Sequence, residues 1–240
     1  MLWVWMYSVT RTRPFPGSKF PDERMCVAGG VAVAEVGMAA VKALREQTGA
    51  GIMDCKEALV RADGDVAKAV DWLRAKGLAS AAKKASRQAT EGLIVSYIHT
   101  GGRVGVLLEL NCETDFVART DAFAALGRDL ALQIAAMSPE WVRREDVPDQ
   151  AVESLRAELE KEAAASGKPP AIVERIVEGR LAKFYQEKCL LEQAFIRDED
   201  QTVDVLIRGV IARVGENIVP RRFTRFQLGE AAGDRGGSFE

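Results

Sequence analysis

Histidine is almost absent from this 240-residue chain: the only one, His99, lies in a strand pattern with no sequence-evident nucleophile or ligand partner. The four cysteines, Cys26, Cys55, Cys112 and Cys189, are widely spaced and contain no Cys-x-x-Cys pair. The absence of such a pair argues against a zinc site and a disulfide scaffold, and a single histidine without a metal-spaced cluster argues against most hydrolytic and metal chemistries. The sequence therefore predicts no catalytic residue, no metal and no cofactor, and the scattered thiols suit a reducing compartment.

Long apolar runs and a strong net charge are also missing. No apolar run approaches the roughly 20 residues of a membrane helix, and the formal net charge is −2. We therefore expect no membrane partner and no general attraction to nucleic acid. A basic run between Trp72 and Thr90 contains no acid. It is interpreted as a solvated linker helix, with RNA or phosphate contact as the minority alternative.

Residues 1–37 are kept apart from the fold. Their first seven residues are apolar but lack the preceding basic region of a secretory signal. The first 21 residues contain no acid, so an organellar transit segment and a misassigned start, with Met38 as the initiator, both stay open. We expect a cytoplasmic protein with a disordered N-terminal extension at residues 1–37, and organellar import as the alternative.

Three short helices are expected in a domain of residues 38–77, at about 39–47, 52–62 and from Asp65 onward. Glycines end the first helix, and Asp65 can cap the third. In the second helix, Ile52 and Cys55 share one apolar face with two later residues. Met53 lies outside that face. Met53 is therefore either an ordinary surface residue or a contact for a partner protein.

The spacing of apolar residues changes from helical to alternating after an expected basic linker at residues 78–91. Alternation over residues 93–99, a glycine turn at 100–102 and alternation from Val104 to Leu110 predict a β-hairpin. Residues 218–228 are basic and aromatic, and we expect them to join the hairpin as a third strand. Residues 201–214 fit either a helix or a strand.

Helices are expected to cover this sheet. The first has an apolar stripe and ends at Ser138-Pro139, and the stripe consists of Phe123, Leu126, Leu130, Ile134 and Met137. A charged helix at 149–166 and a further helix after Pro170 follow. The predicted fold class is α+β: a helical domain, a basic helical linker and a small three-stranded antiparallel sheet packed with helices in a domain of residues 92–228. The Gly-rich tail 229–240 is expected to be disordered.

Residues 111–119 leave the second hairpin strand and begin a helix, with Asp115 and Phe116 side by side. A phenylalanine here needs either a slot in the core or a pocket in a partner. Helical spacing places Phe116 on the same stripe as Phe123, which favours the core. Thr114 or Asp115 would then serve only as the N-cap of the helix.

Three segments of the chain resemble the family of translation elongation factor Ts. They are residues 41–59 (VKALREQTGAGIMDCKEAL), residues 111–119 (NCETDFVAR) and residues 215–223 (GENIVPRRF). The likeness extends over about residues 38–230, with the segments in the family's order. Three long signatures together are highly specific.

The resemblance implies a guanine nucleotide exchange factor that has no catalytic chemistry of its own. Such a factor binds the GTPase elongation factor Tu with GDP and promotes release of the GDP through an Asp-Phe wedge near the Mg²⁺ site. It also implies a ubiquitin-associated-like fold for residues 38–77. The partner contacts carried over by position are Arg45, Ile52, Met53, Thr114, Asp115, Phe116 and Val117. The family usually has Met where Ile52 stands.

Longer members of the family have two related core subdomains, whereas this sequence shows one hairpin core. Short members look dimeric, so the resemblance implies a homodimer and a two-plus-two complex with the GTPase. From the residues alone, two other interpretations stay open. One is a ubiquitin-associated-type interaction module at residues 38–76, and the other is an RNA-binding protein that uses the basic residues at 74–87 and 221–225. An enzyme built on Cys112 and His99 is the weakest interpretation.

Overall fold

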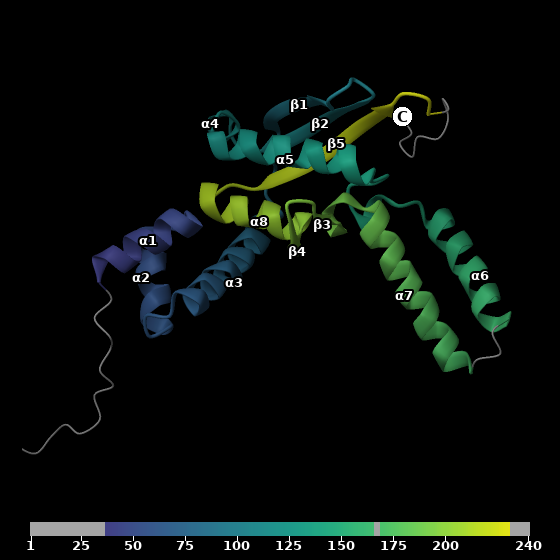
Figure 1. Cartoon of the computed structure of the whole chain (residues 1–240), viewed down its shortest axis with the longest axis horizontal. Helices are drawn as coiled ribbons and strands as arrows, with labels where there is room; N and C mark the ends of the chain where they lie inside the picture. The colour runs from purple at the N-terminus through teal and green to yellow at the C-terminus, as the bar shows by residue number, and fades with distance from the viewer. Residues whose placement is uncertain (1–36, 166–168, 231–240) are drawn as a thin grey trace, which may run out of the picture. The chain divides into compact units, whose positions relative to one another are not determined.

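The computed structural model describes residues 37–165 and 169–230 (Figure 1). These residues form an α+β fold with eight α-helices, a three-stranded sheet and a two-stranded sheet. The expectations for residues 1–36 and for the tail beyond residue 230 lie outside the described residues.

The predicted N-terminal helices are present as α1 (Met38–Thr48), α2 (Ile52–Arg61) and α3 (Val66–Lys84). They enclose a small core of their own, made of Val41, Leu44, Cys55, Ala58, Leu59, Ala69 and Leu73. The carboxylate of Asp65 caps α3 by accepting a hydrogen bond from the Lys68 N–H at 3.2 Å, as expected.

α3 continues beyond the three-helix domain. Residues 78–84 of the expected basic linker are its last two turns, and Ala81 is buried in the main core of the molecule. The connection outside the helix is therefore short, at residues 85–90.

The predicted hairpin and third strand form one antiparallel sheet. Its strands are β1 (Glu91–Ile98), β2 (Val104–Cys112) and β5 (Ile218–Gln227), in the order β1-β2-β5. A bulge opposite Glu109 and Leu110 accommodates Pro220 on the edge strand β5, where a residue without an N–H is tolerated.

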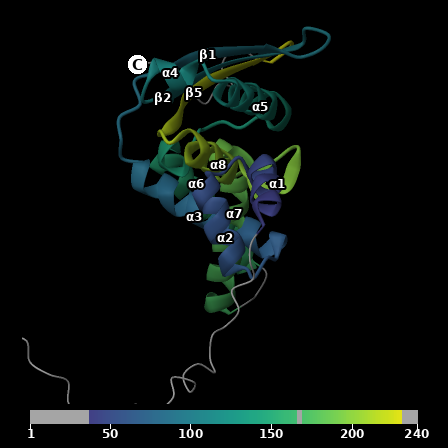
Figure 2. The same ribbon diagram turned by 90° about the vertical axis from the view of Figure 1, so that its left-hand side faces the viewer.

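One face of this sheet packs on α5 (Asp121–Met137), and Figures 1 and 2 both show the helices on that side. A side chain at Gly127 would place its Cβ 2.8 Å from Val95, so glycine lets α5 approach the sheet. Phe123 and the next three residues of the predicted stripe are buried. Met137 is 47% exposed, against expectation, because it is the last residue of α5.

Residues 201–214 are mostly helical: α8 (Val203–Val214) follows β4 (Asp198–Thr202). Helical spacing buries Val203, Ile207 and Ile211, which is why the β-branched content did not produce a strand. The two-stranded sheet of β3 (Ala194–Phe195) and β4 was not predicted, because its strands are too short to show a clear period.

The two remaining long helices are α6 (Asp149–Ala165) and α7 (Pro170–Lys188), close to the bounds expected for them. They pack against each other through a separate apolar cluster of Leu159, Ala163, Val177 and Leu181. Single 3₁₀ turns at Arg144–Asp146 and Leu190–Glu192 flank this pair.

Candidate functional site

The corner after β2 displays an aromatic ring to solvent. It is formed by α4 (Asp115–Ala118), a helix of four residues, in which Phe116 is 77% exposed. Val117 and Ala118 are buried at 4% and 5% exposure in the main core. The interpretation of Phe116 as a core residue is wrong, because α4 ends before α5 begins and its ring does not continue the stripe of Phe123.

The two residues before this ring, Thr114 and Asp115, are also exposed. Thr114 is the N-cap of α4, and its hydroxyl accepts a hydrogen bond from the Val117 N–H at 3.4 Å. The carboxylate of Asp115 pairs with the guanidinium of Arg119 at 2.9 Å, with side chains that are 65% and 80% exposed. Such a pair contributes at most about 1 kcal/mol. Asp115 can therefore exchange Arg119 for a group on another molecule at little cost.

A second group of expected contact residues lies at α1 and the start of α2. Met53 is 75% exposed and Arg45 is exposed. Ile52, expected on the buried face of its helix, is instead 46% exposed because it is the first residue of α2. Neighbouring apolar side chains are thus presented to solvent at the N-terminus of this helix.

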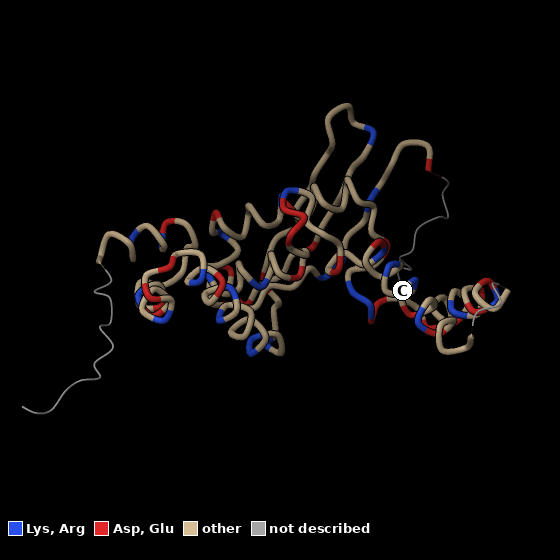
Figure 3. The backbone as a smooth tube through the Cα atoms, turned by 60° about the horizontal axis from the view of Figure 1, so that its bottom comes forward, with Lys and Arg blue, Asp and Glu red and all other residues tan. Residues whose placement is uncertain are grey.

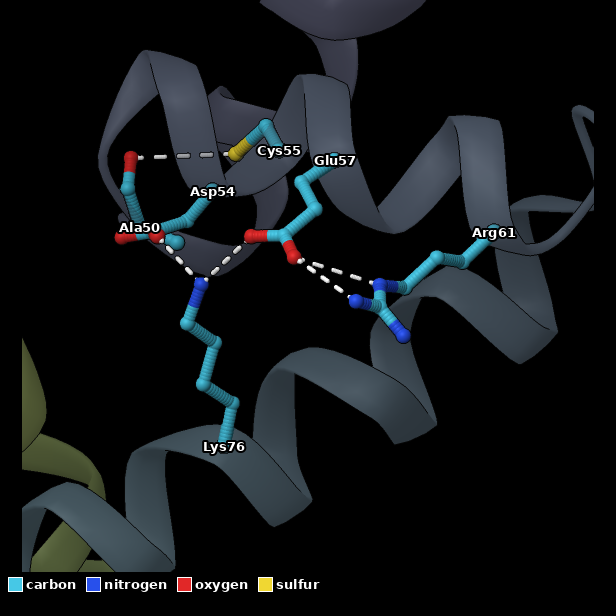
Figure 4. Close-up of polar contacts among 6 residues, drawn as sticks. All are labelled: Ala50, Asp54, Cys55, Glu57, Arg61 and Lys76. Atoms are coloured by element: carbon cyan, nitrogen blue, oxygen red, sulfur yellow. Dashed lines mark hydrogen bonds and ion pairs between the residues drawn. The ribbon is translucent and has the colours of Figure 1, made fainter.

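Ion pairs hold α2 against α3 (Figure 4). The Lys76 ammonium lies 2.8 Å from the Asp54 carboxylate and 2.7 Å from that of Glu57, which also pairs with Arg61. The hydrogen bond from Lys76 lowers the pKa of Glu57, and those to Asp54 and Glu57 raise the pKa of Lys76. This network orients the helix that carries Ile52 and Met53.

Known proteins are similar in sequence to most of this chain. A family model described as Elongation factor TS matches residues 78–230. The protein named Elongation factor Ts of Carboxydothermus hydrogenoformans is 60% identical over 190 residues, which cover 79% of this chain and 88% of the relative. The chain belongs to the elongation factor Ts family. A relative of the same name from Heliobacterium modesticaldum is 56% identical over 201 residues, 84% of this chain and 94% of its own.

Family membership makes this a protein of translation elongation, and so of protein biosynthesis. The matched residues 78–230 contain the exposed corner and the segment 215–223, which the fold brings together. The register pairs Cys112, the last residue of β2, with Ile218, the first residue of β5. Two of the elongation factor Ts signatures are therefore neighbours in space.

Glu216 and Asn217, in the turn between α8 and β5, also contact the corner. Neither residue was predicted to belong to the site. Their only signal in the sequence was their place in the resemblance to elongation factor Ts. Because their partners lie more than 100 residues earlier in the chain, no local pattern could have identified them.

The interpretation as an enzyme built on Cys112 and His99 is wrong. In the register of the hairpin, Cys112 pairs with Glu91 at one end of β1, whereas His99 follows the other end. Cys112 is fully buried, and burial, with a contribution from the negative charge of Glu216, raises the pKa of its thiol. The side chain of His99 instead shares a hydrogen bond with the Tyr97 hydroxyl at 2.9 Å.

Most of the described helices carry charged residues of both signs (Figure 3). None of the helices formed by residues 37–165 and 169–230 combines the length and apolar character needed to cross a membrane. In that same part of the elongation factor Ts chain, no three His, Cys, Asp or Glu residues form a group that could hold a metal ion.

Proposed function

We propose that this chain is a cytoplasmic guanine nucleotide exchange factor that binds elongation factor Tu with GDP and promotes release of the GDP. The observation that carries the proposal is the exposure of Phe116, at 77%, on a corner whose next two residues are buried. A large apolar side chain that the fold holds away from its own core is suited to a pocket in a partner. Family membership in elongation factor Ts supports that partner being elongation factor Tu.

The proposed wedge consists of Asp115 and Phe116. A GTPase holds its nucleotide through backbone donors, a lysine and Mg²⁺ around the phosphates. A ring and a carboxylate inserted near these groups displace them and weaken the grip on GDP. Val117, although counted among the partner contacts by resemblance, is buried, so we assign it the role of anchoring the wedge from inside.

Exchange by this route needs no bond to be made or broken. The factor accelerates release because it binds best to the GTPase conformation that holds nucleotide poorly. Burial of a phenylalanine contributes roughly 1.5–3 kcal/mol, which is about a 10- to 100-fold bias if the pocket is open only in that conformation. By linkage, GDP weakens the binding of the factor by the same ratio, so that the factor is released again.

We propose that the helical domain is ubiquitin-associated-like and gives a second contact. Arg45, Ile52 and Met53 would dock on the nucleotide-binding domain of the GTPase, with the flexible Met53 adapting to the surface. Two contacts on one chain raise each other's local concentration. The helical domain would then contribute affinity, and the wedge would contribute the acceleration.

We further propose a homodimer formed through the uncovered face of the sheet. This face carries Ile98, Leu107 and Phe226, which are 68%, 49% and 49% exposed. The register places Ile98 and Phe226 in one row on either side of Gly105. Leu107 lies two residues after Gly105 on β2, and therefore on the same face of the sheet. Two such faces can pack as a sandwich with the same residues on both sides, as in a twofold dimer. The complex with elongation factor Tu would then contain two chains of each kind.

The experiment that tests the function measures the release of fluorescent GDP from elongation factor Tu. Purified protein at stoichiometric amounts is expected to speed release by at least tenfold over the GTPase alone. Serum albumin at equal concentration is the control. No acceleration at any concentration would refute the proposed function.

A further inference from the structure

The turn at the end of β2 and the turn at the start of β5 are joined by reciprocal hydrogen bonds, in which each turn supplies one carboxylate as the acceptor. The Glu216 carboxylate accepts hydrogen bonds from the Thr114 N–H at 3.0 Å and from the Thr114 hydroxyl at 2.7 Å. In the opposite direction, the Glu113 carboxylate accepts a hydrogen bond from the Asn217 N–H at 2.7 Å. We call these four residues the carboxylate clamp. It continues the pairing of β2 with β5 beyond the last residue pair of the sheet.

The clamp also holds the end of α3. The side-chain amide of Asn217, 3% exposed, donates hydrogen bonds to the carbonyls of Ala85 at 3.3 Å and Arg87 at 2.9 Å. The Arg87 guanidinium in turn lies 3.5 Å from the Glu113 carboxylate. Three segments that are distant in sequence therefore meet around one turn.

The short α4 depends on this support. A helix of four residues has too few internal hydrogen bonds to be stable by itself. The buried Val117 fixes its far side, and Thr114 fixes its near side. Both polar groups of Thr114 that face the turn are taken by Glu216, whose own position is set by Gly215, at φ +85°, a conformation that favours glycine. Asp115 and Phe116 lie between these two fixed points.

We propose that Glu216 is a positioning residue for nucleotide exchange: its carboxylate, through Thr114, holds the Asp115–Phe116 wedge in the orientation that enters the GTPase. The inference rests on the proposed exchange function and deepens it. Preorganisation of this kind raises the rate because no ordering cost is left for the moment of insertion.

The first test is release of fluorescent GDP from elongation factor Tu, measured over a range of factor concentrations. Glu216→Ala is expected to lower the maximal release rate roughly 3- to 10-fold, the effect of one or two lost hydrogen bonds. Glu216→Gln retains one acceptor oxygen for Thr114, so its maximal release rate should lie between that of Glu216→Ala and that of the wild type. Asp204→Ala, which removes a partly exposed carboxylate paired with Arg208 on α8, is the matched control and should leave exchange unchanged.

A double-mutant comparison separates positioning from a general loss of structure. If Glu216 acts through the wedge, Glu216→Ala should have a smaller effect on the maximal rate in a Phe116→Ala background than in the wild type. A loss of folded protein would instead lower the active concentration in both backgrounds and leave the maximal rate intact. Circular dichroism of each variant checks that it is folded.

The outcomes separate the two levels of the proposal. If Phe116→Ala slows GDP release and Glu216→Ala releases GDP as fast as the wild type, the positioning role is overturned and the exchange function stays in place. Equal effects of Glu216→Ala in both backgrounds also overturn it. If neither the wild type nor any variant accelerates release, the exchange function itself fails and the inference fails with it.

Discussion

Replacement of Phe116 by alanine tests the wedge most directly. The ring is 77% exposed in the free protein, so about three quarters of its transfer free energy is available for burial in a partner. Taking a phenylalanine as roughly 1.5–3 kcal/mol, this is about 1.2–2.3 kcal/mol. If the ring is buried only in the conformation that releases GDP, Phe116→Ala should slow release roughly 8- to 50-fold.

The same exposure predicts almost no effect on folding. An exposed side chain outside any network changes stability by about 0.5 kcal/mol or less, which is a shift of the thermal midpoint of about 2 °C or less. Phe123→Ala is the contrasting variant because Phe123 is fully buried. It should cost about 3–5 kcal/mol and lower the midpoint by roughly 6–20 °C.

The assay combines release of fluorescent GDP with thermal unfolding followed by circular dichroism. Ile172→Ala removes another exposed apolar side chain, on α7, and should change neither measurement. A large loss of stability in Phe116→Ala with normal exchange would refute the reasoning, because the ring would then serve its own fold.

Three further predictions concern other parts of the molecule. Light scattering after size exclusion should show a dimer at micromolar concentration, and Leu107→Asp should give a monomer; a monomeric wild type would contradict the dimer. Iodoacetamide at neutral pH should leave exchange intact in Cys26→Ser, because the other three cysteines are buried, and inactivation would count against this. The pKa of Glu57 is lowered by its hydrogen bond with Lys76, so its contribution to stability is present at neutral pH and is lost as the pH falls through the lowered value. Glu57→Gln should therefore unfold at a lower temperature than the wild type at pH 7, and the difference should shrink as the pH falls below the usual range of a glutamate. A difference in unfolding temperature that persists in acid would show that the charge of Glu57 is not its cause.

Much of the fold could be predicted because its elements have a local period. The alternation from Val104 to Leu110 identified β2, and helical spacing identified α5, because each pattern is written in consecutive residues. The pattern was weakest at the ends of elements. Ile52 and Met137 share the period of their helices yet are exposed, because a terminal turn can extend beyond the surface on which its helix packs.

The candidate site was predicted only in part. The resemblance to elongation factor Ts pointed to Phe116, whereas the helical period placed that ring in the core. The structure shows that α4 and α5 are separate helices, so a common stripe through Phe116 and Phe123 does not exist. The contact of Glu216 with Thr114 could not be predicted, because the two residues lie 102 positions apart in the sequence.

The amino-acid sequence by itself determined the secondary structure of the core, the scarcity of histidine and the membership of a family. These properties depend on residue types and on short spacings, which are visible in the sequence. The exposure of Phe116 and the meeting of Thr114 with Glu216 were decided only by the tertiary structure. Both depend on how β2 and β5 pair, and strand pairing brings together residues whose separation along the chain carries no local signal.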